Sequence, residues 1–68
     1  MKENKCNVPV ELVCGESRRT IKNLFMIPSI GETLQYNGIP YLINNVIYHS
    51  KEGFAPYIEL KVTDVSTI

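Results

Sequence analysis

The sequence lacks the long apolar runs that mark membrane proteins and secreted proteins. Its longest uninterrupted apolar run covers only residues 24–27, far below the roughly 20 residues that cross a bilayer. Near the start of the chain, polar residues and Pro9 interrupt what would have to be the apolar segment of a signal peptide. We therefore expect no membrane span and a cytoplasmic protein.

An excess of charge of either sign is also missing, because seven basic residues balance seven acidic ones. A dedicated nucleic-acid binder needs clustered basic residues that the rest of the surface does not cancel. Only Arg18, Arg19 and Lys22 approach such a cluster. Nucleic acid therefore ranks below other partners, and a nucleic-acid-binding barrel that uses these residues and Lys51 is kept as an alternative.

Residues that carry chemistry are equally scarce, with one histidine, His49, one aspartate and two cysteines. These residues are too few for a typical catalytic triad or zinc site, so we expect no enzyme, no cofactor and no metal. A fold that joins a cysteine to His49 as a nucleophile pair is the alternative. Along one extended strand Cys6 and Cys14 would lie about 27 Å apart, whereas a disulfide needs Cα atoms within about 7 Å. Both thiols should therefore be free.

The sequence is rich in β-branched residues, with eight Ile, six Val and four Thr against a single Ala. Such side chains suit a pleated sheet and crowd a helix. An apolar fraction of 44% and a charged fraction of 21% are typical of a folded domain and not of a disordered segment. We expect one all-β domain over residues 1–62 and a C-terminal tail over residues 63–68.

Apolar and polar residues alternate in a way that predicts five strands. Asn37–Gly38 is a strong hairpin signal and predicts paired strands over residues 33–36 and 39–49. The alternation slips at Asn44–Asn45, which predicts a β-bulge. The other expected strands cover residues 6–14, 18–27 and 57–62. The side chains expected in the core are those of Val8, Val10, Leu12, Ile21, Leu34, Tyr36, Ile39, Tyr41, Ile43, Val46, Tyr48, Ile58, Leu60 and Val62.

The stretch from Pro28 to Tyr48 combines Gly31–Glu32, a short strand, the Asn37–Gly38 turn and a bulged strand. In this it resembles the SH3-like small barrels of many short bacterial and phage proteins of unassigned function. The resemblance rests on turn and core positions and transfers no site residue. It implies a five-stranded SH3-like barrel built from antiparallel hairpins, acting as a binding module. By analogy we expect a phage or bacterial accessory or inhibitor protein, working in the host cytoplasm if it is phage-encoded.

Several large apolar side chains are left outside the expected core. They are Leu42, Ile47, Phe54, Tyr57 and one of the pairs Leu24/Met26 or Phe25/Ile27. Scattered over the surface they would need no explanation, but clustered they would form a patch that monomers seldom expose. We expect them to bind a host protein or a second copy of the chain. Binding a second copy would make the protein a homo-oligomer, and this is the state that we expect. A structural subunit of a larger particle is a further alternative.

Aromatic and basic residues also gather around the loop before the last strand, namely Tyr48, His49, Lys51, Phe54 and Tyr57. Aromatic rings beside cationic side chains can stack a base, so a small nucleotide-like signalling molecule is a second expected ligand. Tyrosines at strand ends can equally pack over a barrel mouth. Arg18 and Arg19, next to a turn, could bind a phosphate or form a solvated hairpin tip.

Overall fold

The computed structural model of the chain describes residues 8–22, 24 and 26–66. They form the strands β1 (Val10–Cys14), β2 (Ser17–Ile21), β3 (Thr33–Tyr36), β4 (Ile39–His49) and β5 (Tyr57–Asp64). This part of the chain contains no helix, and the prediction of an all-β fold with five strands is confirmed. No helix long and apolar enough to cross a bilayer is found in it.

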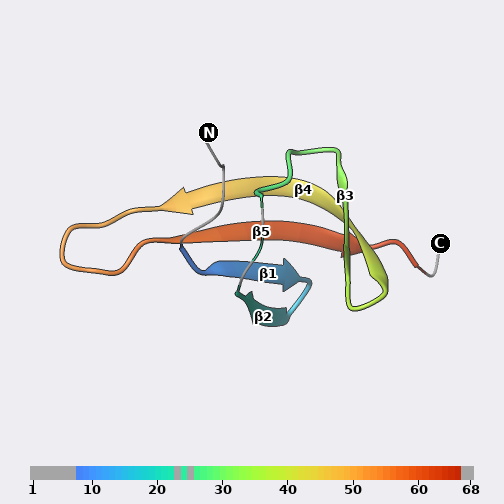
Figure 1. Ribbon diagram of the computed structural model, residues 1–68, viewed down its shortest axis with the longest axis horizontal. Helices are drawn as coiled ribbons and strands as arrows, with labels where there is room; N and C mark the ends of the chain where they lie inside the picture. Colours follow the sequence, from blue (N-terminus) through green and yellow to red (C-terminus); the bar gives the residue numbers. More distant parts are fainter. Residues whose placement is uncertain (1–7, 23, 25, 67–68) are drawn as a thin grey trace, which may run out of the picture.

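The strands form one sheet in the order β2-β1-β5-β4-β3, and Figure 1 shows β5 between β1 and β4. Neighbours that are consecutive in sequence pair antiparallel, but β1 pairs with β5 in parallel, with Val10 opposite Ile58. The prediction that the fold is built from antiparallel hairpins alone is therefore wrong. No turn joins β1 to β5, so local sequence signals do not set the direction of this pair.

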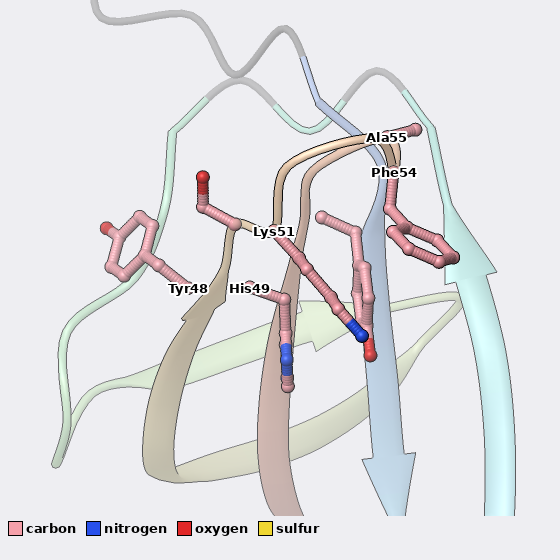
Figure 2. Close-up of a pocket in the computed structure, with 7 residues that line it drawn as sticks. Tyr48, His49, Lys51, Phe54 and Ala55 are labelled. Atoms are coloured by element: carbon pink, nitrogen blue, oxygen red, sulfur yellow. The ribbon is translucent and has the colours of Figure 1, made fainter.

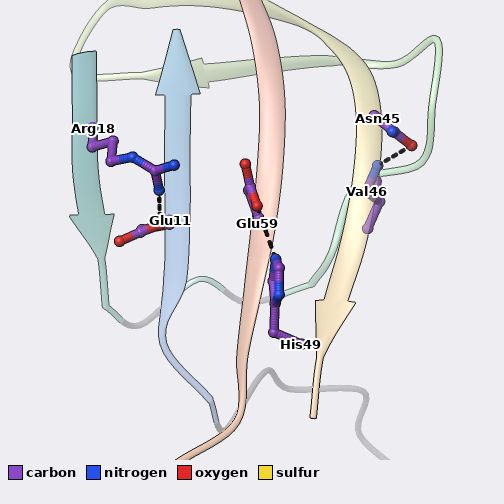
Figure 3. A network of polar contacts seen from close by, with 6 residues as sticks. All are labelled: Glu11, Arg18, Asn45, Val46, His49 and Glu59. Atoms are coloured by element: carbon purple, nitrogen blue, oxygen red, sulfur yellow. Dashed lines mark hydrogen bonds and ion pairs between the residues drawn. The ribbon is translucent and has the colours of Figure 1, made fainter. Parts of the chain in front are cut away.

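The sheet curves into a half-barrel because β4 bends strongly along its length. Figure 1 shows β4 running beside β5 and then turning so that β3 crosses the direction of β5. The register of β4 on β5 shifts between Ile43 and Asn45, which confirms the predicted bulge. The side-chain Oδ1 of Asn45 accepts a 3.0 Å hydrogen bond from the backbone N–H of Val46 (Figure 3). Within the described residues β2 and β3 end the sheet without pairing with each other.

The β3–β4 hairpin has the bounds that the sequence predicts. Asn37 and Gly38 have φ angles of 53° and 80°, and positive φ at both central residues is the requirement of a type I′ turn. Tyr36 lies opposite Ile39 across this turn. The turn therefore fixes which residues of β3 and β4 share a face.

The core is formed by eight buried side chains, those of Val10, Leu12, Ile21, Tyr41, Ile43, Ile58, Leu60 and Val62. All were expected there, and five further members of the expected set pack against them as partly buried residues. The expectation fails at Tyr48, whose side chain is 67% exposed. Tyr48 lies opposite Ile58 on the core side of the sheet, but it is the last residue but one of β4, where the sheet ends.

The expected second strand over residues 18–27 is wrong in its second half, because β2 ends at Ile21. The chain then leaves the sheet, yet Leu24 and Ile27 still pack against the core, while Met26 is 50% exposed. Neither expected outward pair therefore projects as a unit, and Phe25 lies outside the described residues.

The other strand ends also differ from the expectation. β1 begins at Val10, and residues 6 and 7 of the expected first strand lie outside the described part of the chain. β5 continues through Asp64, so Thr63 and Asp64 belong to the last strand and not to a tail. Asp64 pairs with Tyr41 there. Cys14 is free, as predicted, and the same prediction for Cys6 falls outside the described residues.

Candidate ligand-binding site

An open-sided hollow of about 420 Å³ lies where β4 ends, the loop turns and β5 begins. Its lining consists of Tyr48, His49, Ser50, Lys51, Phe54, Ala55 and Tyr57, and we call it the loop hollow (Figure 2). The loop is closed by a 3.0 Å hydrogen bond from the backbone N–H of Phe54 to the carbonyl of Lys51. Gly53 supports this turn with a φ of 86°, in the region that glycine occupies most readily.

An aromatic stack forms one wall of the loop hollow. His49 and Tyr57 lie directly opposite each other on β4 and β5, so their side chains project from the same face of the sheet. Their ring centroids are 4.3 Å apart and the ring planes differ by 9°. The strand pairing thus stacks the two rings on each other beside the loop, and the outer face of each ring is left for a ligand.

Glu59 holds the His49 ring in place from within the sheet. Its carboxylate Oε1 lies 2.8 Å from His49 Nε2 (Figure 3), and the Glu59 residue is only 7% exposed. An ionised carboxylate can only accept hydrogen bonds, so Nε2–H donates and the ring orientation is fixed. Sequence reasoning did not select Glu59. The available signal in the sequence was that Glu59 follows Tyr57 by two residues and so lies on the same face of the strand.

A cation and a third ring complete the loop hollow. The ammonium nitrogen of Lys51 lies 4.8 Å from the centre of the Phe54 ring, within the range of a cation–π interaction. Phe54 is 66% exposed. Figure 2 shows Lys51 and Phe54 on the same side of the sheet as His49. Lys51 is the one lysine or arginine in the lining, and no acidic residue lines the hollow.

Tyr48 lines the edge of the loop hollow, but its ring lies apart from the other aromatic rings. Figure 2 shows it pointing away from His49 and Phe54, as expected for neighbouring residues of one strand. It lines a second, more apolar hollow of about 410 Å³ on the core side, together with Val46 and residues 27–30.

The remaining predicted site residues lie elsewhere. The Arg18 guanidinium makes a 2.5 Å ion pair with Glu11 (Figure 3), while Arg19 is exposed on the opposite face of β2, where it lies across from Leu12. Leu42 and Ile47 are half-buried. None of these residues lines the loop hollow.

Metal binding receives no structural support in the part of the chain that is described. No three histidine, cysteine, aspartate or glutamate side chains come together there in a way that could hold an ion.

Comparison with protein-family models, with curated proteins and with solved structures found no match. The function of the chain is therefore argued from the loop hollow itself.

Proposed function

We propose that the protein is a non-enzymatic binding module that captures a small nucleotide-like ligand in the loop hollow. The observation that carries this proposal is the stacked His49–Tyr57 pair with Lys51 and Phe54 beside it. A flat aromatic surface next to a cation suits a planar base that carries a phosphate.

The size and charge of the loop hollow support such a ligand. A volume of about 420 Å³ falls within the range of small-molecule sites. The base would stack on the exposed rings, and the Lys51 ammonium would attract the phosphate. The hydroxyl of Ser50, which also lines the hollow, can donate a hydrogen bond to the sugar or the base edge, or accept one from it.

In this proposal the chain acts by sequestering its ligand and releases it unchanged. Glu59 makes His49 a fixed part of the wall, which supports a role in binding geometry. We further propose that the half-barrel is of the SH3-like kind found in small bacterial and phage proteins. Its biological role would be that of a cytoplasmic accessory or inhibitor protein, in the host cytoplasm if phage-encoded.

Calorimetric titration with AMP, GMP and a cyclic dinucleotide tests this function. At least one probe should bind to the wild-type protein and be recovered unchanged. Phe54→Ala and Tyr57→Ala should each weaken binding, because stacking on an aromatic ring contributes about 1–3 kcal/mol per base. That range corresponds to a loss of roughly 5- to 150-fold in affinity.

Ile30→Ala is the matched control, because Ile30 is a large apolar side chain about as exposed as Phe54 but does not line the loop hollow. It should leave the affinity unchanged. Absence of binding for all three nucleotides would refute the proposal, as would binding that Ile30→Ala weakens and Phe54→Ala does not. A single-stranded oligonucleotide that binds more tightly than AMP, with a steep salt dependence, would favour the nucleic-acid alternative.

A further inference from the structure

Charge is distributed very unevenly along the chain. Between Lys22 and Lys51 there is one charged residue, Glu32, and its carboxylate accepts a 2.7 Å hydrogen bond from the backbone N–H of Ser29. This charge-poor segment contains β3 and β4. Of the four large hydrophobic side chains that are exposed among the described residues, three belong to it, namely Met26, Ile30 and Tyr48. Depletion of charge is the compositional mark of an interface core.

The two edge strands of the sheet, β2 and β3, also differ in the charge of their side chains. An open strand edge presents unpaired backbone groups that can pair with another chain, and charged side chains protect against this. β2 carries Arg18 and Arg19 side by side. β3 has the sequence Thr-Leu-Gln-Tyr, without charge or proline, and β4 is the one strand it contacts in the described structure. The β3 edge is therefore the unprotected one.

The pairing of the hairpin shows which backbone groups of β3 face outward. In a two-residue hairpin the pair that flanks the turn, Tyr36 and Ile39, exchanges backbone hydrogen bonds, and bonded and non-bonded pairs alternate from there. The 2.9 Å bond from the N–H of Ile43 to the carbonyl of Glu32 agrees with this alternation. The N–H and C=O groups of Thr33 and Gln35 consequently point away from β4, and both residues are exposed.

We propose that two copies of the chain associate through β3, with the strands antiparallel about a two-fold axis at Leu34. Thr33 of each copy would then exchange backbone hydrogen bonds with Gln35 of the other. Such an interface is self-complementary, since both copies present the same donors and acceptors. The two Leu34 side chains would meet directly across the axis on the core side. This inference is independent of the ligand proposed for the loop hollow.

A second copy fits this edge better than a charged partner would. The uncharged strand meets its own copy without repulsion, whereas β2 would place arginines against arginines. An open half-barrel with eight buried core residues also gains from added apolar burial, because a domain of this size hides only about 60% of the surface that its unfolded chain exposes. A standard interface takes about 800 Å² per partner, roughly a sixth of the 5108 Å² surface.

Sedimentation velocity over a dilution series, with circular dichroism as the check on folding, tests the proposal. The wild-type protein should have twice the 7.7 kDa mass of one chain. Gln35→Pro removes an outward N–H without removing a hairpin bond, and Thr33→Lys adds a charge to the edge. Both variants should be monomers with the wild-type spectrum. Thr20→Lys, the same change at an exposed threonine on β2, should remain a dimer.

Amide hydrogen exchange locates the contact. The Thr33 and Gln35 amides should exchange slowly in the wild-type protein and rapidly in Thr33→Lys, since in a monomer they face water. If Gln35→Pro fails to fold, Thr33→Lys alone decides the question. A monomeric wild-type protein throughout the series would overturn the proposal and leave β3 open to a foreign strand. So would a dimer that persists in Thr33→Lys, because another surface would then hold it.

Discussion

Replacing His49 with leucine should destabilise the fold by stranding the Glu59 carboxylate. Glu59 is the one charged or polar residue that is buried in the described structure, and its bond to His49 Nε2 is 2.8 Å long. A buried charge that loses its partner retains its desolvation cost without compensation. The change should therefore be felt in stability even if no ligand is present.

The loss of stability expected in His49→Leu depends on how far His49 and Glu59 are each buried. Hydrogen bonds to charged groups contribute about 1.5–3 kcal/mol. The His49 side chain is 37% exposed, so water can reach part of the bond and the lower end of that range applies. We expect His49→Leu to cost about 1.5 kcal/mol, which lowers the Tm of a domain this small by about 6–12 °C. His49→Gln keeps a side-chain N–H donor and should cost less.

Urea unfolding followed by circular dichroism, arranged as a double-mutant cycle, measures the coupling directly. Glu59→Leu should be neutral or stabilising, because replacing a buried charge with an apolar side chain often is, and His49→Leu should cost nothing further in that background. The Glu11–Arg18 pair is the control, with side chains 29% and 58% exposed, and its coupling should stay below about 1 kcal/mol. An equal or larger coupling there, or an unchanged stability in His49→Leu, would show that the buried Glu59 carboxylate does not depend on His49.

Three further outcomes are expected. Gly38→Val should lower the free energy of unfolding by more than about 1 kcal/mol, because Gly38 has a φ of 80°; an unchanged Tm would contradict the turn. The Ser66 hydroxyl, followed by the Ser66 backbone N–H, lowers the pKa of Asp64 below its ordinary value. The ionised Asp64 therefore stabilises the folded chain at pH values above the ordinary pKa of aspartate, and this contribution is lost as the pH falls through the lowered pKa. The Tm difference between wild type and Ser66→Ala should therefore disappear in acid. Cys14 should react with iodoacetamide without prior reduction, as mass spectrometry would show.

The sequence predicts the locally determined parts of the fold well. The bounds of β3 and β4 follow from the Asn37–Gly38 turn, and the bulge near Asn45 follows from a slip in the apolar alternation. The core set is recovered for the same reason, since period-two patterns report which face is buried.

The errors fall where long-range packing decides the structure. The apolar run over residues 24–27 predicts a strand, but β2 ends at Ile21, and Leu24 and Ile27 pack against the core from outside the sheet. The parallel pairing of β1 with β5 joins distant segments, and no local signal sets its direction. Tyr48 has the phase of a core residue but lies at the end of the sheet.

The candidate site also has one part that the local sequence predicts and one part that it does not. His49, Lys51, Phe54 and Tyr57 are close in sequence around one loop, so grouping them was possible without a structure, and the loop hollow brings them together. For Arg18 the sequence leaves open a phosphate contact or a solvated hairpin tip, and the structure pairs its guanidinium with Glu11 on the neighbouring strand. The role of Glu59 needed the register of β4 on β5, which sets the diagonal contact with His49.

A nuclear magnetic resonance titration of the isotope-labelled protein with AMP shows directly whether a nucleotide binds in the loop hollow. We expect saturable shift changes at the amides of residues 49–57, with ring-current shifts in the side chains of Phe54 and Tyr57. Residues of the Asn37–Gly38 turn, at the opposite end of β4 from the loop hollow, should stay unchanged. Shift changes centred on Arg18 and Arg19, or no changes at a nucleotide concentration that saturates ordinary small-molecule sites, would contradict a ligand site in the loop hollow.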